Sequence, residues 1–147
     1  MKKLDLDSMD VFDIENYTQE AIKDIDDKIK SVFSIDADEL YENIVVIVET
    51  LGYLTNRLYK EKLLLNYYTQ CFSHVKEKLL VKYKYGSIRD LDRIESMIET
   101  SSDWKKYDGI VFSQNLICEH IQTRMKIIKN QIFNIKDIID IKKFEAV

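Results

Sequence analysis

The sequence predicts an all-α fold made of long helices that pack through heptad seams. Proline, which breaks helices, is absent from the 147 residues, and only three glycines occur. Charged residues make up 33% of the chain, and Ile, Leu, Lys, Asp and Glu dominate, a mixture typical of long helices and coiled coils. Two series of apolar residues at alternating spacings of three and four predict such helices directly.

The first 33 residues are expected to form an acidic arm and a first helix. Residues 1–17 are acidic and weakly periodic, which indicates a flexible or loosely docked arm. A helix is predicted from about Thr18 to Phe33, and its apolar face carries Ala21, Ile22, Ile25 and Ile29. Ser34–Asp36 then breaks the helix, and Asp36 or Asp38 can cap the next one by accepting its unpaired backbone N–H groups.

The clearest feature is a heptad seam that continues for more than five repeats and must therefore face another helix. Its members are Leu40, Ile44, Ile47, Leu51, Leu54, Leu58, Leu65, Tyr68, Phe72, Val75 and Leu79. Glu61 is the one interruption of the series. Gly52 leaves two possibilities open, either one continuous helix of roughly 60 Å or two stacked helices.

A second seam follows after two breaks in the helical pattern. Gly86 is expected to end the long helix, and Ser87–Asp90 resembles a capping box for a short helix that runs to about Glu99. After a polar break at Thr100–Asp103, the last helix is predicted from about Trp104 to Phe144 (residues 104–144). Its seam consists of Ile121, Met125, Ile128, Ile132, Ile135 and Ile139. Apolar residues also lie off this seam, at Ile117, Ile127, Ile138 and Ile141, and so wide a face indicates contact with more than one neighbour.

Two long seams in a chain of this length favour self-association. Packing of the two seams against each other as a hairpin within one chain is the alternative. Residues 34–147 are predicted to form one helical domain in either case, preceded by the arm and first helix at 1–33.

The charge is distributed unevenly along the chain, although the net charge is only −4. Residues 1–50 carry 14 acidic and 5 basic side chains. The segment 57–89 instead carries eight basic residues and only two acidic ones, Glu61 and Glu77. Such an asymmetry can mark a polyanion site in one part of the chain and an acidic arm in another. The arm is a solubilising tail, a segment that contacts a basic partner, or a mimic of nucleic acid that competes for the basic segment.

Within that basic segment, lysines and tyrosines interleave between Lys76 and Tyr85. Lysines neutralise phosphates and tyrosines can stack on unpaired bases, so the pattern is compatible with nucleic-acid binding. The plainer interpretation is a solvated helix end, where the helix dipole favours cations. The pattern suits DNA and RNA equally.

The sequence contains no pattern that predicts catalysis, a cofactor or a metal. Three isolated glycines do not make a phosphate-binding loop, and Asp24, Asp26 and Asp27 lack the spaced loop of an EF-hand. His74 and His120 are far apart in sequence, and the cysteines Cys71 and Cys118 have no partner at metal spacing. We therefore expect a non-enzymatic protein with reduced cysteines in a cytoplasmic setting. No signal peptide or membrane-spanning run is evident.

Three short segments resemble the UvsY family of phage recombination mediators. The most specific is Phe133–Asp140 with Phe144–Ala146, which is similar to the closing signature of the family: an aromatic residue, Ile-Lys, Ile and a later Phe. Lys82–Gly86 resembles the basic, tyrosine-containing segment that precedes a glycine. Ile35-Asp36 with Leu40 and Glu42 resembles the opening of the first long helix. Their order and approximate spacing agree with the family over about residues 31–147.

This resemblance implies a bacteriophage protein of DNA recombination and repair that acts in the cytoplasm of an infected bacterial host. Family members form hexameric or heptameric rings through their C-terminal helices, bind single-stranded DNA, weaken the hold of the single-strand-binding protein, and help load a RecA-like recombinase. The implied DNA-binding residues are Lys76, Lys78 and Lys82, with Lys84 and Tyr83 as weaker additions. The implied oligomerisation residues are Ile121, Met125, Ile128, Ile132, Phe133, Ile135, Ile138 and Ile139. The alternative function is a structural coiled-coil adaptor without a nucleic-acid role, and a helical enzyme subunit is a distant third.

Overall fold

The part of the chain that the structure describes is almost entirely helical. The computed structural model describes residues 8–34, 39–84 and 91–147, and in these ranges it contains no strand. Its elements are α1 (Val11–Ile29), the 3₁₀ helix η1 (Lys30–Phe33), α2 (Leu40–Lys84), α3 (Leu91–Thr100) and α4 (Ser102–Glu145). The predicted all-α class is therefore confirmed.

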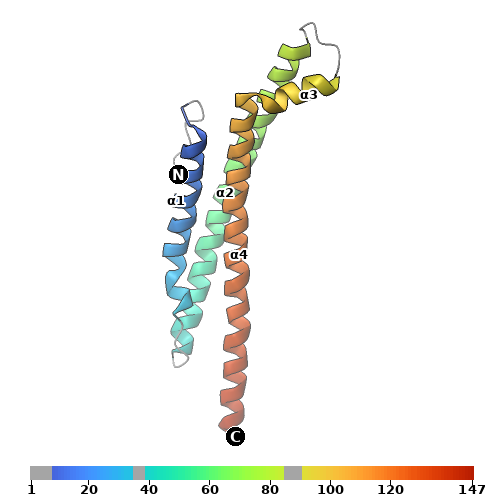
Figure 1. Ribbon diagram of the computed structural model, residues 1–147. Coiled ribbons are helices and arrows are strands. Elements are labelled where there is room, and N and C mark those ends of the chain that lie inside the picture. Colours follow the sequence, from blue (N-terminus) through green and yellow to red (C-terminus); the bar gives the residue numbers. More distant parts are fainter. Residues whose placement is uncertain (1–7, 35–38, 85–90) are drawn as a thin grey trace.

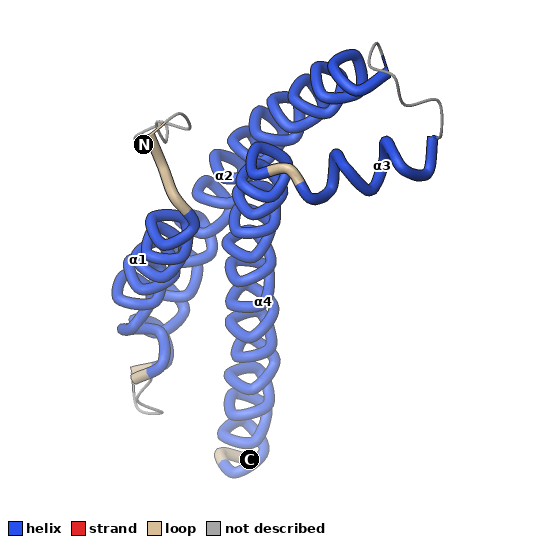
Figure 2. Tube along the Cα trace, turned by 45° about the horizontal axis from the view of Figure 1, so that its top comes forward, coloured by secondary structure: helices blue, strands red, loops and turns tan. Residues whose placement is uncertain are grey.

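Helices α2 and α4 form a long antiparallel hairpin, and α1 packs along α4 in the same direction as α4 (Figure 1). The short helix α3 lies across the C-terminal end of α2, and the C-terminal end of α4 extends past the other helices (Figure 2). The central core is a row of buried aliphatic side chains from α1, η1, α2 and α4: Ala21, Ile25, Ile29, Val32, Ile47, Leu54, Ile117, Ile121, Ile128 and Ile135. Each Val, Leu or Ile side chain of this row contributes about 1.5–3 kcal/mol when fully buried, so the row is a main source of stability.

Helix α1 begins at Val11, so the predicted start at Thr18 was wrong and residues 11–17 are not a flexible arm. The backbone N–H of Asp13 donates to Asp10 Oδ1 (2.8 Å), and that of Asp10 donates to Asp13 Oδ2 (3.0 Å), which forms a capping box. One turn later Ile14 is buried beside Leu64, Tyr68 and Ile110. The prediction missed this start because the cap uses two aspartates inside an acidic run, where they read as solvated charge.

Helix α2 is continuous through Gly52, which decides between the two possibilities that the sequence left open. A side chain added at Gly52 would meet no atom within 4 Å, so no neighbour needs the space that this glycine leaves. Along the predicted seam, Ile47, Leu54, Tyr68 and Leu79 are buried, whereas Ile44 is exposed. The seam therefore packs within the chain, most deeply at Ile47, Leu54 and Tyr68, which are separated by seven and fourteen residues.

Glu61 is part of the seam, although in the sequence it reads as an interruption. Its side chain is only 1% exposed. Arg57 Nε donates to Glu61 Oε1 (2.6 Å), and Gln114 Nε2 of α4 donates to Glu61 Oε2 (2.6 Å) and to the Glu61 carbonyl (3.0 Å). Tyr17 of α1 donates to Gln114 Oε1 (3.5 Å), and burial, together with the Glu61 charge, raises the pKa of this tyrosine so that it stays protonated. The interruption is thus a buried polar network that joins three helices.

Part of the wide apolar face of α4 packs inside the chain. Ile121, Ile128 and Ile135 are buried in the central core, and Ile117 is also buried there although it lies off the predicted seam. Helix α4 contacts both α2 and α1. Two helices of the same chain therefore cover part of this face, whereas Ile127 and Ile141, which also lie off the predicted seam, are exposed.

The junction before α4 agrees with the sequence to within two residues. Ser101 caps α4 by accepting a hydrogen bond from the Trp104 backbone N–H (3.2 Å), so the helix begins at Ser102. The predicted caps at Asp36 or Asp38, the end at Gly86 and the capping box at Ser87–Asp90 lie outside the described residues. None of the described helices combines the length and the apolar composition needed to cross a bilayer.

Candidate nucleic-acid interface

Helix α2 is divided electrostatically into two halves. Residues 40–56 carry two carboxylates, Glu42 and Glu49, and no basic side chain. Residues 57–84 carry seven basic side chains and two carboxylates, of which Glu61 is buried. Glu77 is consequently the single acidic side chain that the second half of α2 exposes. A surface of this composition attracts polyanions.

The four lysines predicted to bind DNA are all exposed near the C-terminal end of α2, where the helix dipole also favours cations. They do not share one side of the helix. Each residue is rotated by about 100° from the previous one, so Lys76 and Lys78 point to opposite sides, while Lys78 and Lys82 point to the same side. Within the described part of the chain, none of the four lysines forms an ion pair. The end of α2 is thus cationic on several sides.

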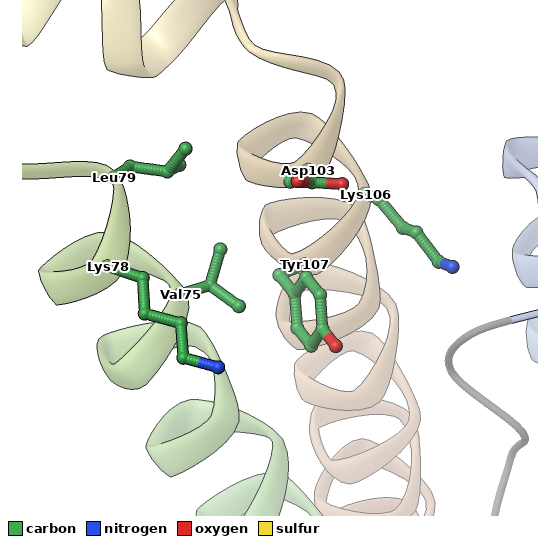
Figure 3. A pocket seen from close by; sticks show the side chains of 6 residues that line it. All are labelled: Val75, Lys78, Leu79, Asp103, Lys106 and Tyr107. Atoms are coloured by element: carbon green, nitrogen blue, oxygen red, sulfur yellow. The ribbon is translucent and has the colours of Figure 1, made fainter. Parts of the chain in front are cut away.

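Lys78 lies at a pocket of about 310 Å³ between α2 and α4 (Figure 3). Its side chain extends toward the space in front of Tyr107, whereas the side chain of Lys106 points away from α2 (Figure 3). The remaining lining residues are Val75, Leu79 and Asp103. Lys106, and Lys105 beside it, place further cations at the start of α4. Sequence reasoning missed these two because it followed one helix at a time.

Lys76 lies on the other side of α2, beside aromatic rings. Its Nζ is 5.5 Å from the centre of the Trp104 ring, and that ring packs against Phe72 with 4.5 Å between the centroids. A cation over an indole face is held by the ring quadrupole while its outer side stays accessible. The geometry thus orders Lys76 without neutralising it.

Tyr83 is less accessible than its predicted stacking role requires. It is half-buried against the cluster that Leu79 of α2 forms with Ile94 and Ile98 of α3. Lys82 Nζ lies 5.7 Å from the centre of the Tyr83 ring. Part of this ring is therefore occupied by packing within the chain, which sequence periodicity alone did not reveal.

The first cation of the segment 57–89 is engaged inside the fold. Arg57 pairs with Asp24 (3.3 Å) as well as with Glu61. Burial disfavours the charged guanidinium, but the hydrogen bond and charge of Glu61 outweigh this effect and raise the pKa of Arg57. The accessible basic surface thus begins after Arg57, at Lys60.

A second set of charges joins α1 to α4. Asp26 Oδ1 lies 2.9 Å from both His120 Nε2 and Arg124 Nε, and Asp26 Oδ2 accepts from an Arg124 terminal nitrogen at 3.1 Å. Partial burial works against the charged carboxylate, but the hydrogen bonds from His120 and Arg124 outweigh it and lower the pKa of Asp26. Asp26 thus links α1 to α4 and is part of the fold.

We expect Asp26→Asn to lower stability at neutral pH and to have a smaller effect in acid. Because the folded-state pKa of Asp26 lies below its unfolded value of about 3.9, its contribution is present above that value and is lost as the pH falls through the folded-state pKa. Urea unfolding of both proteins at pH 7 and pH 3 measures the difference. Asp27→Asn, at an exposed neighbouring position, is the matched control. An equal deficit at both pH values would contradict the assignment.

The residues predicted to form an oligomer interface divide into two groups. Ile121, Ile128 and Ile135 are buried within the chain and offer no surface to a second copy. Ile132 and Phe133 are exposed, and Met125, Ile138 and Ile139 are partly buried. Self-association in this fold would therefore use the outer side of the α4 seam.

An apolar pocket of about 330 Å³ opens at this end of the hairpin. It lies between the start of α2 and the C-terminal part of α4, and its lining is apolar except for Lys136: Ile44, Ile47, Val48, Ile132, Ile135, Lys136 and Ile139. Phe144 and Ile141, further along α4, are also exposed. Exposed apolar residues gathered in one region are typical of an interaction surface.

The described ranges hold no cluster of metal-ligating side chains. There, no three His, Cys, Asp or Glu side chains are close enough to hold a metal ion. Cys118 is buried, and burial raises the pKa of its thiol to about 11, which makes it a poor nucleophile. His74 is exposed and His120 is paired with Asp26.

No family model matches this chain, and neither a curated protein nor a solved structure matches it significantly.

Proposed function

We propose that this protein is a recombination mediator that binds single-stranded DNA and helps load a RecA-like recombinase onto DNA covered by single-strand-binding protein. The resemblance of three segments to the UvsY family motivates the proposal. The observation that carries it is the second half of α2, where six exposed lysines stand against one exposed carboxylate.

Mechanistically, the strand would follow the cationic end of α2, with its phosphates at Lys76, Lys78, Lys82 and Lys84. Copies of the chain would associate in a hexameric or heptameric ring through the exposed apolar residues near Ile132 and Phe133. Repeating the lysine end around the ring would raise avidity without any new contact. Holding the strand on this surface would weaken the single-strand-binding protein and expose DNA to the recombinase. The proposal assigns no catalytic step and no cofactor to the chain, and it places the protein in the cytoplasm of a phage-infected bacterium.

We expect the triple variant Lys76→Ala/Lys78→Ala/Lys82→Ala to bind a single-stranded oligonucleotide more weakly and with less salt dependence than the wild type. Each lost phosphate contact should reduce the slope of log K against log salt by about 0.7, so three contacts amount to about two units. Fluorescence anisotropy of a labelled oligonucleotide at several salt concentrations measures both quantities.

The matched control is Lys23→Ala/Lys28→Ala, which removes two cations from α1 and should leave the salt slope unchanged. Weak wild-type binding that does not depend on salt would contradict the proposal.

The second candidate function is a structural coiled-coil adaptor. It is favoured by the apolar pocket between α2 and α4, which has no need of nucleic acid. A protein that forms a stable oligomer in light scattering but does not bind the oligonucleotide at low salt would support the adaptor and exclude the mediator.

A further inference from the structure

An aromatic and aliphatic stripe lies on the outward face of α2, before the residues predicted to bind DNA in chain order. Tyr59, Leu63 and Tyr67 are four residues apart, so their side chains lie one above the other on one side of the helix. They are 64%, 53% and 39% exposed, respectively. Large apolar side chains in a row on the outside of a helix are not explained by packing within the chain.

The surroundings of this stripe are cationic. Lys60 lies on one side of it and Lys62 on the other, and both are exposed. Between residues 56 and 76 of α2, Glu61 is the one carboxylate, and it is buried toward α4. No exposed side chain of α2 in this stretch would therefore repel a phosphate. The combination of ring faces with flanking lysines is the composition of single-strand binding surfaces.

The same stripe leads toward the proposed DNA-binding end of the helix. Steps of three and four residues along one side of α2 connect Tyr59, Leu63, Tyr67, Gln70, His74 and Lys78, of which all are exposed. Because α2 is continuous, this path does not change direction at a loop. A strand bound at Lys78 and Lys82 can thus continue along the helix to Tyr59.

The ring of Tyr67 lies next to that of the fully buried Tyr68, with 5.7 Å between the ring centroids and 60° between the planes. Most of the Tyr67 ring that is not against the chain is therefore open to a base. Tyr59 lies one helical turn before Leu63 on the same helix.

The composition of the stripe favours nucleic acid over a protein partner. A standard protein interface takes about 20–30 residues from each side, whereas the apolar residues here are three in a row among lysines and amides. The apolar pocket near Ile132 has the opposite character, since its lining has one charged side chain and it lies at the acidic half of α2.

We propose that Tyr59 and Tyr67 form a base-stacking platform that extends the single-strand path from the lysine end of α2 along its outward face, with Leu63 between them. Lys60 and Lys62 would contact the phosphates on either side. The inference rests on the proposed function, because it takes single-stranded DNA to be the ligand.

The test is binding of a fluorescent oligothymidylate to the full chain in which Tyr59 and Tyr67 are changed singly to Ala or to Phe. Each Tyr→Ala change should weaken binding between about 5-fold and 150-fold, the range of base–aromatic stacking, whereas Tyr→Phe keeps the ring face and should stay within about 2-fold. Tyr41→Ala is the matched control, since Tyr41 is 80% exposed on the acidic half of the same helix. An oligonucleotide with abasic sites should bind wild type and the Ala variants equally.

The outcomes separate this inference from the proposed function. If the wild type binds DNA and the lysine variant does not, but both Tyr→Ala variants bind like the wild type, the platform is wrong and the lysine site stands. If the wild type does not bind DNA, both fail. If Tyr→Ala changes the oligomer mass in light scattering and leaves DNA affinity unchanged, the stripe is an interface between copies, and the platform is again excluded.

Discussion

Arg57→Met is expected to destabilise the protein by about 3–5 kcal/mol, because it leaves the Glu61 carboxylate buried without its cation. Glu61 is 1% exposed and receives 2.6 Å hydrogen bonds from Arg57 and Gln114. Gln114 remains a partner in the variant but carries no charge. The free energy of unfolding from urea titration, followed by circular dichroism, measures the loss.

Two further variants show whether the loss comes from the pair. Arg57→Met/Glu61→Leu removes both charges and should recover most of the stability, since a well-packed apolar pair often replaces a buried ion pair without loss. Lys60→Met, an exposed cation one turn away, should change stability by no more than about 0.5 kcal/mol. If the double variant is as unstable as the single one, Glu61 is not the source of the loss.

Ile25→Ala is expected to cost about 2–5 kcal/mol, because it opens a cavity where α1 meets the central core. Ile25 is fully buried and belongs to the same cluster as Ile117 and Ile121 of α4. Thermal unfolding should show a lower midpoint for the whole molecule in one transition.

The exposed Val11→Ala in the same helix serves as the comparison and should have a small effect. If Ile25→Ala melts α1 alone and leaves the midpoint of the remaining helices unchanged, α1 would be an appendage and not part of the cooperative core.

The fold class and the bounds of α4 followed from periodicity, which reports on burial along a single helix. The seam from Leu40 to Leu79 predicted α2, because apolar residues at spacings of three and four must face a partner. Glu61 was misread for the same reason. A carboxylate breaks an apolar pattern, and the sequence does not show that Arg57 and Gln114 satisfy it.

The candidate interface was only partly predictable. Charge counts located the basic half of α2, since counting needs no geometry. They could not show that Arg57 forms ion pairs with Asp24 and Glu61 inside the fold. Nor could they show that Tyr83 packs against Ile94 and Ile98. The exposed tyrosines at 59 and 67 were inside the predicted segment but were not singled out. Both tyrosines occupy positions off the heptad seam, and large side chains at such positions are the sequence signal that would have identified them.

The continuity of α2 makes it a rigid spacer between two chemically different ends. Its 45 residues span roughly 65 Å, with the apolar pocket near Ile44 at the start and the lysines at the finish. If copies associate through the apolar end, each one must present its cations at the same height above the contact. The tilt of α2 relative to the axis of such an assembly would then set the radius at which the lysines lie. The same radius would set the curvature of a bound strand.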